Sequence, residues 1–162
     1  MIFVLIAVLI VIVEYKIKNY MDTNLKLGDK KELLGGKIIL NKYYNKGAFL
    51  NFMENKKEIV KTISCIFLGI LILLFAIMLP KKGNKLIKLG LSLVLGGAIS
   101  NVSDRYLRGY VVDYFSINCK CKKLKNIVFN LADIAIFLGS FLIFLSSAFS
   151  GIIKSGTDKT AE

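Results

Sequence analysis

Two aspartates of this 162-residue chain stand among apolar residues, where a carboxylate is costly to place. Asp113 follows two valines and precedes Tyr114 and Phe115, and Asp133 lies within the apolar sequence that begins near residue 127. Two carboxylates that lie close together do not both ionise easily, so such a pair shares one proton. One member can then take a proton from water while the other protonates a carbonyl oxygen, as peptide-bond hydrolysis requires. The residue types therefore predict Asp113 and Asp133 as a catalytic pair.

Amide and basic side chains accompany the aspartates at helical spacing. Asn130 precedes Asp133 by three residues and Asn101 precedes Arg105 by four, so each pair shares one face of a helix. The glycines of Gly96–Gly97 permit close helix approach. Because polar groups inside or beside a membrane span are costly, we interpret them as functional.

The same residues also have simpler structural interpretations. The Asn130–Asp133 segment could begin a helix and cap its first turn. Asp104 could form an ion pair at a helix end with Arg105 or Arg108. Asp113 could lie in an exposed turn at the membrane interface. The sequence leaves these alternatives open.

The composition excludes several other classes of chemistry. The chain has no histidine and no Cys-x-x-Cys pair, which excludes histidine-based catalysis and an ordinary zinc site. With 55% hydrophobic residues the chain is not disordered, and three cysteines make no disulfide framework. The net charge of +12 favours anionic lipid headgroups or keeps the outer loops soluble. We expect no metal ion, no cofactor and no nucleic-acid partner.

The apolar residues form four blocks that predict membrane-spanning helices, since about 20 residues cross the hydrocarbon core. The predicted spans lie at about residues 2–20, 62–79, 86–105 and 127–150 of a single membrane domain, 1–162. The outer loop, about 21–61, contains β-forming residues at Lys37–Tyr44 after a turn at Gly35–Gly36. Asn51–Lys61 is typical of a short polar helix. We therefore predict a membrane all-α fold with a small extracytoplasmic β-sheet on the membrane surface.

Charge between the spans predicts the orientation. The short loop Pro80–Lys85 and the following Lys88 carry four lysines and no acid, which places this loop and both termini in the cytoplasm. The first block lacks the basic start and the small-residue cleavage site of a signal peptide, so we expect it to remain as a span. Lys16 and Lys18 at its end could extend to the headgroups.

Four sequence blocks together resemble a known family. They are Asn45–Phe49, Asn101–Arg105, Val111–Tyr114 and Phe129–Asp133, and their order and spacing resemble the signature blocks of lipoprotein signal peptidase (signal peptidase II). The sequence of four spans, a long first outer loop and a short basic inner loop is also similar. The resemblance extends from Met1 to about Phe144.

The resemblance implies an intramembrane aspartic endopeptidase of the bacterial cell (inner) membrane, with both termini cytoplasmic. Its substrate would be a prolipoprotein that carries diacylglycerol on a cysteine, and cleavage would occur just before that cysteine. Asp113 and Asp133 match the family's catalytic aspartates. The residues that match substrate-binding or supporting positions are Asn45, Asn101, Arg105, Asn130 and the basic Lys18. We expect the substrate and membrane lipid as partners, and we expect the protein to be a monomer.

The chain departs from the family pattern at three places, which indicates a divergent member. Glu14–Tyr15 stands where the family has Asp-Gln, the block Asn45–Phe49 lacks one alanine, and a basic insert lies at Asn118–Lys123. Two other functions remain as alternatives, and the departures permit the second of them. One is a small four-helix transporter subunit that uses Glu14, and the other is an inactive homologue that only binds lipoproteins.

Overall fold

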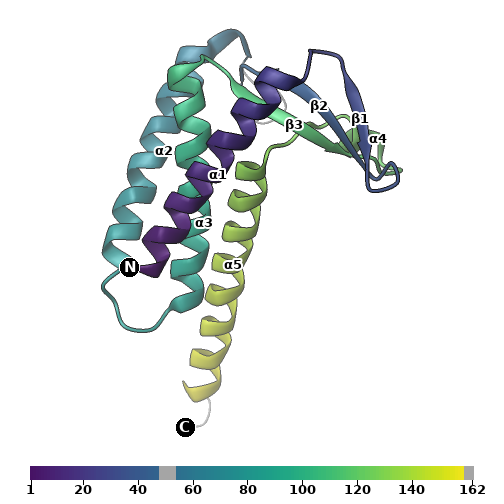
Figure 1. Ribbon diagram of the computed structural model, residues 1–162. Coiled ribbons are helices and arrows are strands. Elements are labelled where there is room, and N and C mark those ends of the chain that lie inside the picture. Colours follow the sequence, from purple (N-terminus) through teal and green to yellow (C-terminus); the bar gives the residue numbers. More distant parts are fainter. Residues whose placement is uncertain (48–53, 159–162) are drawn as a thin grey trace.

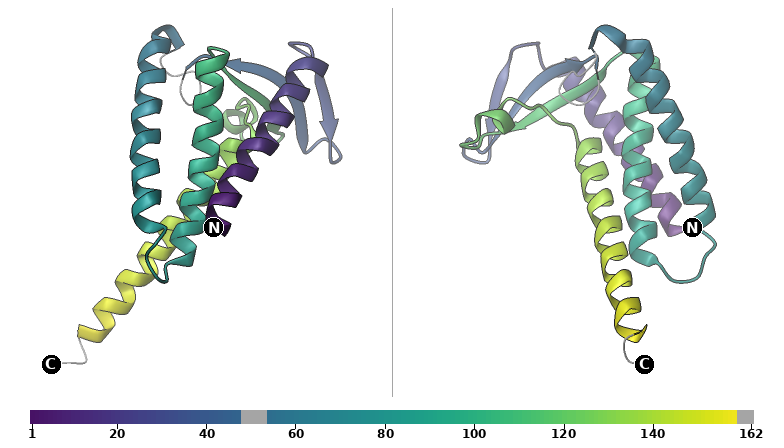
Figure 2. Two further views of the ribbon diagram at one scale, coloured as in Figure 1. Left: turned by 60° about the vertical axis from the view of Figure 1, so that its left-hand side comes forward. Right: turned by 180° about the vertical axis from the view of Figure 1, so that it is seen from behind.

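Four long helices form the body of the protein, with a small sheet at one end. The computed structural model describes residues 1–47 and 54–158 (Figure 1). The long helices are α1 (Ile2–Asn24), α2 (Lys57–Met78), α3 (Lys85–Leu107) and α5 (Leu131–Asp158), with two short elements, η2 (Glu54–Lys56) and α4 (Lys122–Lys125). Figure 2 shows the sheet extending to one side of the bundle, at the end opposite the loop between α2 and α3.

Three helices of the described chain are long and apolar enough to cross a membrane, at Lys57–Met78, Lys85–Leu107 and Leu131–Phe149. They correspond to the predicted spans 62–79, 86–105 and 127–150. The helix α1 has 23 residues but carries Glu14, Lys16 and Lys18 in its second half. A fourth span at residues 2–20 therefore stays a prediction.

The helix α3 lies at the centre and contacts each of the other long helices. Small residues bring the backbones together there, as the sequence predicts for Gly96–Gly97. A Cβ atom on Gly97 would lie 2.5 Å from the carbonyl oxygen of Ala132 in α5, and one on Gly96 would lie 2.8 Å from the carbonyl oxygen of Ala7 in α1. Any larger residue would push these helices apart.

Three strands of the described chain form an antiparallel sheet with the order β1-β2-β3. Their bounds are β1 (Lys30–Leu33), β2 (Ile38–Asn45) and β3 (Val111–Ile117). The predicted strand Lys37–Tyr44 is therefore confirmed as β2, and the turn before it contains Gly35 and Gly36, both with positive φ. The third strand, which carries Asp113, was not predicted.

Two predicted helix boundaries are wrong. The last long helix begins at Leu131 rather than 127, because Phe129 pairs with Phe115 of β3 through backbone hydrogen bonds of 2.7 and 3.0 Å. The apolar residues before Asn130 thus extend the sheet. The predicted polar helix Asn51–Lys61 is instead η2 followed by the start of α2, and its residues 51–53 lie outside the described part of the chain.

Candidate active site

Asp133 lies in the first turn of α5, where it forms a reciprocal cap with Asn130. The Asn130 backbone N–H donates to Asp133 Oδ2 at 3.1 Å, and the Asp133 N–H donates to Asn130 Oδ1 at 2.9 Å. This arrangement satisfies two backbone donors and fixes both side chains. The capping interpretation is therefore correct, but it leaves Asp133 Oδ1 free to accept from Asn101 Nδ2 at 2.9 Å.

Two further N–H groups at the start of α5 are bound from outside the helix. Leu131 donates to the Tyr114 hydroxyl at 2.9 Å, and Ala132 donates to Glu14 Oε1 at 3.1 Å. The Tyr114 hydroxyl itself donates to Glu14 Oε2 at 2.8 Å. Glu14 of α1 is 0% exposed and therefore does not face lipid. Through these hydrogen bonds it joins α1 to β3 and α5.

Asp113 is a buried residue of β3. Its side chain accepts hydrogen bonds from Asn45 Nδ2 at 3.1 Å and from Asn130 Nδ2 at 2.7 Å. It is 2% exposed, so the alternative of an exposed interfacial turn is wrong. Burial, followed by the negative charge of Asp133, raises the pKa of Asp113 to about 7.

Two asparagine side chains connect the aspartates. Asn130 donates to Asp113 while its Oδ1 binds the Asp133 backbone. Asn101 donates to Asp133 and accepts from Asn130 Nδ2 at 3.3 Å. The amide orientations are thereby fixed, because each oxygen faces a donor and each nitrogen faces an acceptor.

Lys18 binds Asn101 and forms no hydrogen bond with Asp113 or Asp133 among the contacts of the described chain. Its ammonium group donates to Asn101 Oδ1 at 2.9 Å and to Ser100 Oγ at 3.0 Å, and it lies 3.0 Å from Asp104. Lys18 is 1% exposed, so the prediction that it extends to the headgroups is wrong. Hydropathy did not reveal this, because Ser100 and Asn101 lie more than 80 residues away along the chain.

Asp104 fixes the strand that carries Asp113. Its carboxylate forms the predicted ion pair with Arg108, at 3.1 Å, and not with Arg105. It also accepts from the Val112 backbone N–H at 3.2 Å. The residue before Asp113 is thus held against α3.

Arg105 lies at the edge of the site and binds main-chain oxygens. Its Nη1 donates to the Asn101 carbonyl at 3.2 Å, and its Nη2 donates to the Gly47 carbonyl at 3.1 Å. Its Nε is buried and has no hydrogen-bond partner among the residues that the structure describes. Gly47 belongs to the predicted Asn45–Phe49 block, of which residues 48 and 49 lie outside the described chain.

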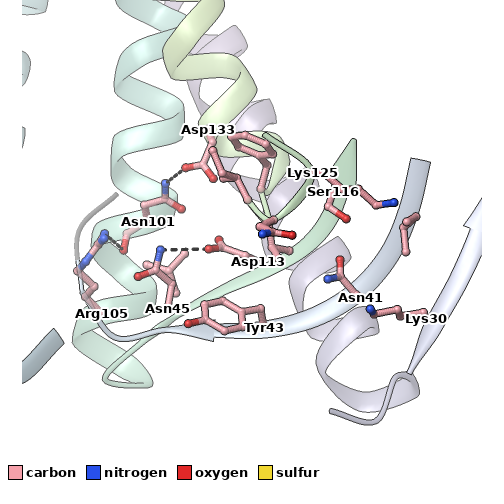
Figure 3. Close-up of a pocket in the computed structure, with 16 residues that line it drawn as sticks. Lys30, Asn41, Tyr43, Asn45, Asn101, Arg105, Asp113, Ser116, Lys125 and Asp133 are labelled. Carbon is pink, nitrogen blue, oxygen red and sulfur yellow. Dashed lines mark hydrogen bonds between the residues drawn. The ribbon is translucent and has the colours of Figure 1, made fainter. Parts of the chain in front are cut away.

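A cavity of about 550 Å³ joins these residues beneath the sheet (Figure 3). Both aspartates line it, together with three of the predicted supporting residues: Asn45, Asn101 and Arg105. In residues 1–47 and 54–158, no group of three acidic or cysteine side chains could hold a metal ion. The two carboxylates in this cavity can exchange protons with a water molecule and with a bound substrate.

A carboxylate pair in a cavity at the end of long apolar helices fits the class of membrane-embedded aspartic peptidases. The family model described as "Signal peptidase (SPase) II" matches residues 6–149. The chain therefore belongs to the signal peptidase II family, a family of membrane proteins and aspartic proteases.

Similar proteins and structures agree with this assignment. The chain is 32% identical to a "Lipoprotein signal peptidase" of Lactobacillus johnsonii over 88% of this chain and 89% of the relative. It is 31% identical to a protein of the same name from Shouchella clausii, over 91% of this chain and 93% of the relative. A solved structure of a bacterial membrane enzyme superposes with a TM-score of 0.77 at 27% identity, covering 97% of this chain and 90% of the other.

Proposed function

We propose that this enzyme removes the signal peptide from diacylglyceryl-modified prolipoproteins by cleaving before the lipidated cysteine. The observation that carries the mechanism is the arrangement of Asp113 and Asp133, which line one cavity and are bridged by Asn130. Family membership supports the peptidase activity. The name shared by the relatives supports the lipoprotein substrate.

The two aspartates share one proton and have different roles. Asp113, with its pKa raised to about 7, is protonated in about half of the molecules at pH 7, and in this form it gives the proton to the carbonyl oxygen of the scissile bond. Asp133, whose carboxylate is held by two N–H donors, takes a proton from the attacking water. The water oxygen bonds to the carbonyl carbon and forms a tetrahedral intermediate. When this intermediate collapses, a hydroxyl proton returns to Asp113, the C–N bond breaks, and the proton held by Asp133 passes to the leaving amine.

The supporting residues keep both carboxylates in position. Asn45 and Asn130 hold the two oxygens of Asp113, while Asn101 orients Asp133. Lys18 positions Asn101, and Arg105 joins Asn101 to the Gly47 loop. These contacts support the prediction that the five residues orient the pair or bind substrate.

We also propose four spans in the bacterial cell membrane, with α1 as the first and both termini in the cytoplasm. Glu14 and Lys18 lie inside the bundle, which removes the main objection to a spanning α1. The first residues, the loop between α2 and α3 and the far end of α5 lie at the same end of the bundle (Figure 1). The site lies at the opposite end, where a substrate anchored by its acyl chains would present its scissile bond at headgroup level. We propose a monomer of one domain.

The test is cleavage of a diacylglyceryl-modified prolipoprotein by the purified protein in detergent. Asp113→Asn and Asp133→Asn should each lower kcat by at least about a hundredfold while the protein stays folded. Asp29→Asn, which changes an exposed aspartate, is the matched control. Wild-type activity in either active-site variant would refute the catalytic assignment.

Two other outcomes would identify the alternatives. Binding of the substrate without cleavage by the wild type would favour an inactive homologue. The transporter alternative is not favoured, because the carboxylate of Glu14 is occupied by the Tyr114 hydroxyl, the Ala132 N–H and Lys18.

A further inference from the structure

The cavity has two chemically different ends on either side of Asp113. One end contains Asn101 and Arg105, against α3. Figure 3 shows Lys30, Asn41 and Lys125 on the side of Asp113 that faces away from Arg105. The aspartates use the middle of the cavity, so the end beyond them has no role in the proposed chemistry.

Two lysines from separate elements give this second end a positive charge. Lys30 begins β1 and Lys125 ends α4. Both side chains are exposed, and within the described part of the chain neither forms an ion pair. Because strongly hydrated ammonium groups avoid the hydrocarbon core of a bilayer, we expect this end of the cavity to open outside that core.

Asn41 adds a directed polar group to the same end. It lies in β2 where the pairing with β3 shifts register, between Leu40 and Tyr43. Such irregularities re-aim a side chain, and here Asn41 lines the cavity. Its Oδ1 is buried and accepts no hydrogen bond from any residue of 1–47 or 54–158. A buried acceptor without a donor is unfavourable, so a donor from a bound molecule would stabilise it.

We propose that Lys30, Asn41 and Lys125 form a subsite for the residues that follow the lipidated cysteine, with a preference for an acidic side chain there. This inference rests on the proposed function. An apolar signal peptide stays in the bilayer, whereas the polypeptide after the cysteine leaves the membrane and needs a water-open exit. When the substrate binds, the Asn41 amide turns toward it so that Oδ1 accepts a main-chain N–H of this segment, and the two ammonium groups attract its carboxylate.

The test uses two synthetic diacylglyceryl peptides that differ only in the residue after the cysteine, aspartate in one and lysine in the other. At low salt, wild-type kcat/KM should be about three- to tenfold higher for the aspartate peptide. This is the gain expected from two exposed ion pairs, formed by Lys30 and Lys125 with the aspartate carboxylate. The double variant Lys30→Gln/Lys125→Gln should lower this ratio to about 1. The control Lys31→Gln/Lys120→Gln removes the same charge, and Lys31 follows Lys30 on the opposite face of β1.

Binding to the Asp133→Asn variant gives a readout that does not depend on cleavage. The same preference for the aspartate peptide in binding would support the subsite even if the wild type cleaved neither peptide, an outcome that would refute only the proposed function. Equal affinity for both peptides, or an unchanged preference in the double variant, would overturn the subsite.

The contribution of Asn41 is tested separately by Asn41→Leu. This variant should raise KM for both peptides by about fivefold, the cost of one lost hydrogen bond, without changing kcat. An unchanged KM with either peptide would remove Asn41 from the subsite.

Discussion

The hydrogen bond from Asn45 to Asp113 should determine the upper pH limit of activity. Asn45 Nδ2 lies 3.1 Å from Asp113 Oδ2 and stabilises the ionised carboxylate, so it lowers the pKa that burial raises. Asn45→Leu removes this donor and keeps a side chain of similar size. A hydrogen bond to a charged group contributes about 1.5 kcal/mol, and about 1.4 kcal/mol corresponds to one pKa unit. The pKa of Asp113 should therefore rise from about 7 by roughly one unit.

The sign of the effect follows from the proposed role of Asp113 as the acid. Activity requires its protonated form and falls as the pH rises through its pKa, so a higher pKa moves the alkaline limb of kcat/KM upward by about one unit. The assay is the pH profile of kcat/KM in detergent with a diacylglyceryl peptide. The control is Asn24→Ala, which removes an exposed amide bonded only to the Tyr20 carbonyl.

An alkaline limb that stays in place, or that moves downward, would refute the reasoning. If instead the acidic limb moved upward, Asp113 would act as the base and Asp133 as the acid. A change in KM alone is expected from the second contact of Asn45, whose Oδ1 accepts the Gly47 N–H at 3.1 Å. That change would not alter the pH limits.

Two further substitutions test how the helices hold the site, each by the free energy of unfolding in detergent. Glu14→Ala should lower the free energy of unfolding by about 3 kcal/mol, because buried charges and the start of α5 lose their partner. The control Tyr15→Ala, at an exposed residue, should change it little. Equal effects of the two substitutions would refute the role of Glu14. Gly97→Ala should cost about 1–3 kcal/mol and reduce activity, because its Cβ would lie 2.5 Å from the Ala132 carbonyl oxygen. The control Gly69→Ala has open space around its Cβ, and an equal loss in that variant would show that the close approach is not the cause.

Much of the fold could be predicted from local sequence patterns. Apolar runs identified the helices α2, α3 and α5, and β-forming residues after two glycines identified β2. The position of Asp113 in a third strand was missed, although the surrounding valine, tyrosine and phenylalanine side chains favour strands. The pairing of that strand with Phe129 depends on contacts between distant segments, and local patterns do not contain them.

The sequence identified residues that the structure brings together around one cavity, but it did not identify the contacts that support them. The two aspartates and their asparagines were found because polar residues inside apolar sequence are rare. The burial of Lys18 and Glu14 was missed, because a charged residue at the end of a span fits a headgroup contact equally well by composition. Only the fold shows that their partners lie on α3, β3 and α5.

The contact between Glu14 and Ala132 joins residues 118 positions apart, and it has a consequence for biosynthesis. The first helix leaves the ribosome long before the segment that carries Asp133. Until that last helix docks, Glu14 lacks the Ala132 N–H and Asp133 has no fixed orientation. A partly synthesised or truncated chain thus holds one aspartate at most in place, and proteolytic activity begins only when the whole bundle is assembled in the membrane.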